Sequence, residues 1–139
     1  MGVEGWLLDK SALIRLPDSP QAKLWAQRIS EGLIHISTIT RLELGYSARS
    51  GKELGTAFTS PPLAKMPIEG LSPAIEELAW QTLQHLAKRG QHRAPSIPDL
   101  LIAATAQLCD LTVLHLDKDF ELISKITGQR TEKLRVKST

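Results

Sequence analysis

Short apolar runs alternate along the chain with longer segments in which apolar side chains recur at helical spacing. The runs at 6–8, 33–36 and 111–116 predict buried strands, because strands covered on both faces are apolar throughout. A short strand is predicted at 66–69 and an edge strand at 134–136. Parallel strands need long crossover connections, which helices fill. The pattern therefore predicts an α/β fold with a central, mostly parallel twisted sheet of four to five strands flanked by helices.

The boundaries of the predicted helices are marked by serine, proline and glycine. Ser19-Pro20 and Ser72-Pro73 each match an N-cap followed by proline at the first helical position. Ser96 and Pro98 mark the start of a further helix. The segment 51–62 contains glycine, serine and a Pro-Pro pair, so it is interpreted as a loop or a broken helix.

Length and composition indicate a single domain over residues 1–139 with one hydrophobic core, since 42% of the residues are hydrophobic. The formal net charge is only +2, so contact with nucleic acid requires local clustering of basic side chains. A single cysteine, Cys109, excludes an internal disulfide. The first residues contain neither a signal-peptide core nor a membrane span, so we expect a cytoplasmic protein that does not bind membranes.

Four acidic residues fall where the predicted strands end or the following helices begin. Asp9 and Asp117 directly follow strands, while Glu43 and Asp99 lie in the first turns of helices. In parallel α/β sheets ligands bind at the carboxyl edge of the strands. We therefore expect all four carboxylates to meet at that edge.

Each acid also has a purely structural interpretation. Thr40 and Glu43 match the spacing of a capping box, and Ser96 with Asp99 offers a similar arrangement. Aspartate after a strand is common in turns. Asp119 is a second candidate for the fourth acid, although we favour Asp117, which directly ends the strand, and interpret Asp119 as the cap of the next helix.

Carboxylates gathered at one edge repel one another unless a proton or a cation neutralises them. Oxygen ligands suit Mg²⁺ or Mn²⁺, and the chain has no cysteine and histidine cluster with the spacing that zinc needs. An acidic site of this kind indicates phosphoryl chemistry in which a metal-activated water attacks the phosphorus.

Four segments carry a resemblance to a known family. They are residues 7–13 (LLDKSAL), 40–45 (TRLELG), 97–104 (IPDLLIAA) and 116–120 (LDKDF). In this order, they make the chain resemble the PIN-domain ribonucleases, and among these the VapC-type toxins of bacterial toxin-antitoxin modules. The resemblance covers nearly the whole chain.

The resemblance implies a PIN-like fold and a metal-dependent endoribonuclease, the toxin of a type II system, that cleaves structured RNA such as transfer or ribosomal RNA. It also implies a homodimer and inhibition by a cognate VapB-type antitoxin. Carried over by position, the resemblance implies that Asp9 and Asp99 are direct metal ligands. Asp117 is counted with them at the metal, and Asp117 and Glu43 complete the acidic site. Ser11 is a hydroxyl beside the first acid and a candidate for the shell of metal-bound water.

Several basic residues are candidates for contact with RNA. Lys10 follows the first acid and could meet a phosphate or simply face solvent. The densest basic segment leads to Asp99 and could guide an RNA backbone, although basic side chains at a helix end also favour its dipole. The candidates in that segment and on the helix of Glu43 are Lys88, Arg89, His92, Arg93 and Arg41.

Two other functions compete with the nuclease. The pair Asp117 and Asp119 suggests a phosphatase-like aspartate nucleophile, but only 20 residues follow Asp119, too few to build the rest of such a site. A non-catalytic α/β domain that binds RNA or protein, with its acids acting only as caps, is the alternative from another class.

Overall fold

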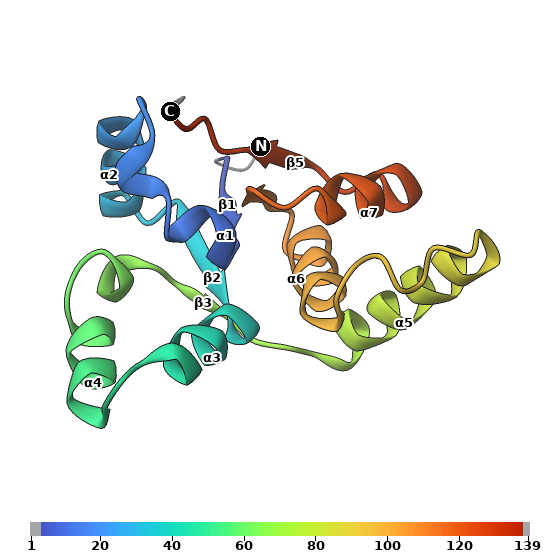
Figure 1. The fold of residues 1–139 in the computed structure, drawn as a ribbon, viewed down its shortest axis with the longest axis horizontal. Helices are drawn as coiled ribbons and strands as arrows, with labels where there is room; N and C mark the ends of the chain where they lie inside the picture. Colours follow the sequence, from blue (N-terminus) through green and yellow to red (C-terminus); the bar gives the residue numbers. More distant parts are fainter. Residues whose placement is uncertain (1–3, 138–139) are drawn as a thin grey trace.

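Five parallel strands form one sheet in the order β3-β2-β1-β4-β5 in the computed structural model, which describes residues 4–137 (Figure 1). Leu7 in the central strand lies opposite His35 on one side and Val113 on the other. The strands are β1 (Trp6–Leu8), β2 (Ile34–Ser37), β3 (Ile68–Glu69), β4 (Thr112–His115) and β5 (Thr131–Lys133). The predicted α/β class with a parallel sheet is confirmed.

Helices connect the strands and cover both faces of the sheet (Figure 1). No helix within residues 4–137 is both long enough and apolar enough to cross a membrane. The helices are α1 (Lys10–Leu13), α2 (Ala22–Ser30), α3 (Thr38–Ser47), α4 (Gly51–Thr59), α5 (Pro73–Lys88), α6 (Ile97–Leu108) and α7 (Asp119–Thr127), with short 3₁₀ turns at Leu16–Asp18 and Leu63–Lys65.

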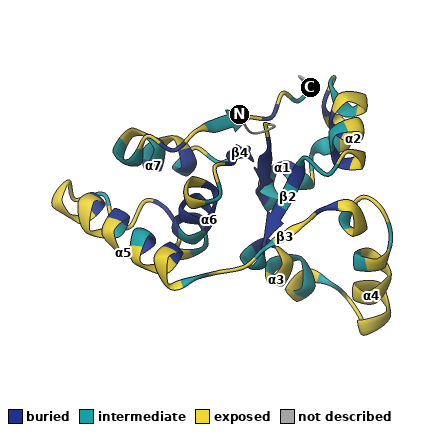
Figure 2. Ribbon diagram, turned by 180° about the vertical axis from the view of Figure 1, so that it is seen from behind, coloured by how far each residue is buried: buried dark blue, intermediate teal, exposed yellow. Residues whose placement is uncertain are grey.

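The core lies in two layers, one on each face of the sheet. On one face, Leu7 and Val113 pack with apolar residues of α5, α6 and α7. On the other, Trp6, Leu8 and Leu114 pack with α1 and α2. Successive strand residues point to opposite faces, so a strand that is apolar throughout supplies both layers. Figure 2 shows the buried strands between helices whose outer surfaces are exposed.

Some predicted boundaries are confirmed and others are wrong. Ser72 and Ser96 cap α5 and α6, as predicted. Ser19 does not cap α2, because its hydroxyl accepts a hydrogen bond from the amide of Gln21 and the helix begins only at Ala22.

The segment interpreted as a loop or broken helix contains α4. Ser50 caps this helix by accepting a hydrogen bond from the amide of Glu53 at 3.1 Å. The serine and glutamate have the spacing of a capping box, a signal that outweighs the two glycines of the segment. The edge strand lies three residues earlier than predicted, at Thr131–Lys133, and the buried Leu134 follows it.

Short connections at the carboxyl edge of the sheet position the candidate site. One residue, Asp9, separates β1 from α1, and α3 begins directly after β2. Three residues separate β4 from α7. Side chains at these junctions are therefore fixed by the strand before and the helix after.

Candidate active site

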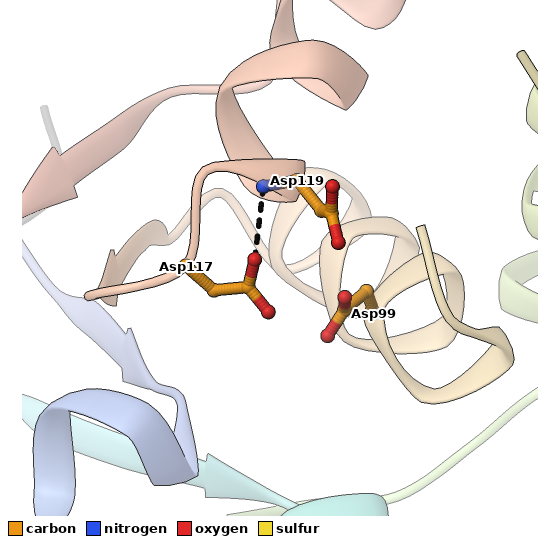
Figure 3. Close-up of side chains that lie close together, drawn as sticks. All are labelled: Asp99, Asp117 and Asp119. Carbon is orange, nitrogen blue, oxygen red and sulfur yellow. Dashed lines mark hydrogen bonds between the residues drawn. The ribbon is translucent and has the colours of Figure 1, made fainter. Parts of the chain in front are cut away.

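Three of the acids form a tight group at the carboxyl edge of the sheet. Asp99 lies in the first turn of α6, Asp117 follows β4 and Asp119 opens α7. Carboxylate oxygens of the three lie within 4.8 Å of one another. Figure 3 shows Asp117 and Asp119 on the turn between β4 and α7 and Asp99 on α6, with their side chains around one small space.

The turn between β4 and α7 explains why Asp119 joins this group. Asp117 Oδ1 accepts a hydrogen bond of 3.0 Å from the amide of Asp119 (Figure 3). The prediction that Asp119 caps the next helix is wrong, because Lys118 occupies the N-cap position of α7 and Asp119 is its first helical residue. The structure thus brings both Asp117 and Asp119 to Asp99, where the sequence offered them as alternatives.

Asp9 borders the tight group and is held by Ser11. Asp9 is only 6% exposed and caps α1, accepting hydrogen bonds from the amide and the hydroxyl of Ser11 on the same oxygen, Oδ2. The Ser11 hydroxyl in turn accepts a bond of 3.0 Å from the amide of Leu116. Ser11 therefore ties the end of β1 to the end of β4, and with them the positions of Asp9 and Asp117.

Glu43 approaches the acids from α3. Burial and the nearby charge of Asp9 raise the pKa of Glu43, while Lys10 acts in the opposite direction. Oε1 of Glu43 is buried without a hydrogen-bond partner among the described residues. The predicted capping box of Thr40 and Glu43 does not form, because α3 starts at Thr38 and its N-cap is Ser37. Glu43 is thus left free of a capping role.

Lys10 is held between two elements beside this site. Its ammonium donates a hydrogen bond of 3.0 Å to the hydroxyl of Ser47, which donates to the backbone carbonyl of Glu43. Lys10 therefore links α1 to α3 and places a positive charge near Glu43.

Burial raises the pKa of Asp99 to about 7, and the charges of Asp117 and Asp9 add to the effect. Hydrogen bonds from Ser96 lower it in part. Burial and the charge of Asp117 also raise the pKa of Asp119. The site therefore favours protons or a cation over free carboxylates.

The residues present fit a hard divalent cation. Asp99, 6% exposed, has no ion-pair partner among the described residues, and Glu43, which has an unpartnered buried oxygen, lies near the charge of Asp9. Carboxylate oxygens are the ligands that Mg²⁺ and Mn²⁺ prefer.

Most of the predicted RNA contacts lie elsewhere. Arg41 lines an apolar groove between α3 and α4 with Leu42, Tyr46 and Phe58. Lys88 and Arg89 are exposed at the outer end of α5, and His92 and Arg93 are exposed in the loop that returns to α6 (Figure 1). Their contact with RNA stays a prediction.

One residue that positions the site was missed from the sequence. The imidazole of the buried His115, the last residue of β4, accepts a hydrogen bond of 3.1 Å from the amide of Asp117 on Nδ1. In the sequence this histidine lies within the apolar run 111–116. Its position two residues before Asp117, at a strand end, was the available signal.

The fold and the site together define a class of protein. It is the α/β domain whose parallel sheet carries an acidic active site at its carboxyl edge. Comparison with protein families matches residues 6–126 to the PIN domain. Ribonuclease VapC2 of Mycobacterium tuberculosis is 57% identical over 129 residues, which cover 93% of this chain and 92% of the relative. The chain therefore belongs to the PIN-domain family and, within it, to the VapC ribonucleases.

Solved structures share the fold. DNA-bound VapBC from Salmonella typhimurium contains a chain that superposes with a TM-score of 0.74 at 19% identity, covering 94% of this chain and 98% of that one. VapBC-5 of Mycobacterium tuberculosis, described as a member of the VapBC family of toxin-antitoxin systems, gives a TM-score of 0.64 at 22% identity, with coverage of 96% and 100%.

Proposed function

We propose that the chain is a metal-dependent endoribonuclease, the toxin of a type II toxin-antitoxin pair, that cleaves structured RNA such as transfer or ribosomal RNA. Membership of the VapC ribonucleases supports the reaction. The observation that carries the proposal is the convergence of Asp99, Asp117 and Asp119, whose carboxylate oxygens lie within 4.8 Å of one another.

In this proposal Asp9, Asp99 and Asp117 hold Mg²⁺ or Mn²⁺, and Asp119 joins them. A bound divalent cation supplies Lewis-acid polarisation of a phosphate oxygen and lowers the pKa of a water. Ser11 fixes the orientation of Asp9 through its two hydrogen bonds to Oδ2. The side chains thus need little rearrangement to present their oxygens.

Glu43 is proposed to orient the attacking water and to accept its proton. Burial and Asp9 raise the pKa of Glu43 towards the pH at which the protein works, which is the condition for an effective general base. Lys10, held by Ser47 near Glu43, keeps part of the carboxylate ionised.

We also propose that the chain acts in the cytoplasm, forms a homodimer and is inhibited by a VapB-type antitoxin. Support comes from the VapBC structures, one of which is described as a toxin-antitoxin system.

The test is cleavage of total cellular RNA by the purified protein with Mg²⁺, Mn²⁺ or EDTA, followed by mapping of new 5′ ends. We expect metal-dependent ends from the wild type, and none from Asp99→Asn or Asp9→Asn. Asp18→Asn is the matched control, because Asp18 is exposed and pairs only with Arg15.

Two results would contradict the proposal in different ways. If the wild type produces no metal-dependent RNA ends, the nuclease proposal is wrong. The alternative of a non-catalytic binding domain is then favoured. If Asp99→Asn cleaves as well as Asp18→Asn, the reaction stands but the acidic site is wrongly assigned.

A further inference from the structure

A cleft of about 430 Å³ opens beside the acidic group on the same edge of the sheet. It lies where β4 ends, α7 begins and β5 ends. His115 and Lys133, the last residues of β4 and β5, lie opposite each other in the ladder. The cleft is lined by Ser11, His115, Leu116, Asp117, Lys118, Glu121 and Lys133. We call it the lysine cleft.

The lysine cleft is continuous with the candidate active site. Asp117 belongs to both, and Ser11 lines the cleft while its hydroxyl bonds to Asp9. A molecule in the cleft would therefore lie directly beside the reacting phosphate. The volume falls within the range of about 300–1,000 Å³ typical of small-ligand sites, large enough for one nucleotide.

The charges of the cleft differ from those of the acidic group. Lys118 and Lys133 are exposed and add two basic side chains to its lining, and Glu121 adds a carboxylate to that of Asp117. Exposed lysines contact phosphates without regard to base sequence. A carboxylate accepts hydrogen bonds from the exocyclic amino groups of cytosine, adenine or guanine, which uracil lacks.

The floor of the cleft is fixed. His115 is buried and lines the cleft. Since Nδ1 accepts from the amide of Asp117, the neutral ring carries its proton on Nε2, a buried atom with no partner among the described residues. The hydrogen bond thus holds the ring in one orientation beside Asp117.

We propose that the lysine cleft binds the nucleotide next to the scissile phosphate of the RNA, an inference that rests on the proposed nuclease function. Lys118 and Lys133 contact the backbone phosphates of that nucleotide. Glu121 accepts a hydrogen bond from its base and so favours bases with an exocyclic amino group over uracil.

The first test compares Lys118→Ala and Lys133→Ala with Lys125→Ala, a matched control on α7 that does not line the cleft. The substrate is a short hairpin RNA whose single-stranded loop contains the mapped cleavage site. We expect KM to rise several-fold with little change in kcat for the two cleft variants. The slope of log kcat/KM against log salt should become shallower by about 0.7 for each lysine, and Lys133→Arg should restore it.

The outcomes separate this inference from the nuclease proposal. If the wild type does not cleave RNA, the proposed function fails. If the wild type cleaves and the cleft variants match Lys125→Ala in KM and salt slope, only the cleft is wrong. A fall in kcat alone, with an unchanged salt slope, also overturns it, because it would indicate a structural role for these lysines.

The second test uses Glu121→Gln with RNA substrates that differ in one base beside the cleavage site. The wild type should prefer cytidine, adenosine or guanosine over uridine at that position. Glu121→Gln should reduce this preference, since an amide can both donate and accept. An identical base preference in wild type and variant would refute the role of Glu121.

Discussion

Asp99→Asn should stabilise the metal-free protein and change how its stability depends on pH. Burial, with Asp117 and Asp9, raises the pKa of Asp99 from the ordinary value of 3.8 to about 7. Between these two values the folded protein retains a proton that the unfolded chain has lost. The free energy of unfolding must therefore fall as pH rises through this window.

The size of the effect follows from the width of the window. About three pH units at about 1.4 kcal/mol per unit give a destabilisation of about 4 kcal/mol above pH 7. Asparagine stays neutral, so the Asp99→Asn variant should not undergo this destabilisation. The hydrogen bond from the backbone amide of residue 99 to Ser96 is retained. Glu43 and Asp119, whose pKa values are also raised by burial, leave part of the slope in the variant.

The assay is urea unfolding in EDTA between pH 5 and pH 8, followed by tryptophan fluorescence, to which the buried Trp6 and Trp25 contribute. The difference between Asp99→Asn and wild type should be about 1.5 kcal/mol at pH 5 and approach its limit of about 4 kcal/mol at pH 8. Mg²⁺ at a hundred times its Kd should add about 2.7 kcal/mol to the wild type and much less to the variant.

The matched control is again Asp18→Asn, an exposed acid whose removal should leave the pH dependence unchanged. Parallel curves for wild type and Asp99→Asn would refute the reasoning, because they would mean that Asp99 has an ordinary pKa. Lower stability of the variant at pH 8 in EDTA would refute it as well, since it would show that the carboxylate is stabilising without a cation.

Two further substitutions test how the site and its sheet are held. Ser11→Ala removes the hydroxyl that joins Asp9 to the amide of Leu116; we expect a loss of about 1–3 kcal/mol in urea unfolding and weaker Mg²⁺ binding by calorimetry. Unchanged stability and Mg²⁺ affinity would contradict this role. Arg28→Ala removes a guanidinium that lies 4.4 Å and 4.5 Å from the ring centroids of Trp6 and Trp25; the midpoint of thermal unfolding should fall by a few degrees, and Lys23→Ala, on the same helix, should not lower it.

The sequence was sufficient to predict the sheet and the approach of four acids to one edge. The runs at 6–8 and 111–116 are apolar throughout, as strands buried on both faces must be, and Asp9 and Asp117 follow them. Since parallel strands share a carboxyl edge, the approach of these two acids follows from topology alone.

What the sequence could not predict depends on local geometry. Asp119 joins Asp117 and Asp99 because the turn after β4 places its amide on Oδ1 of Asp117. The lysine cleft depends on the register of β5, which was predicted three residues late, so Lys133 was not placed beside His115. No periodic pattern encodes either feature, because the first follows from a local turn and the second from the pairing of two strands.

The structural and the catalytic interpretations of the acids turn out not to exclude each other. Asp9 caps α1 through Oδ2 alone, and a carboxylate has a second oxygen. Asp99 bonds with Ser96 at the start of α6, yet its pKa is raised because the bonds from Ser96 do not offset burial and the neighbouring acids. The capping hydrogen bonds at the starts of α1 and α6 therefore hold Asp9 and Asp99 in place. The unfavourable charge that capping leaves uncompensated is what a divalent cation would relieve.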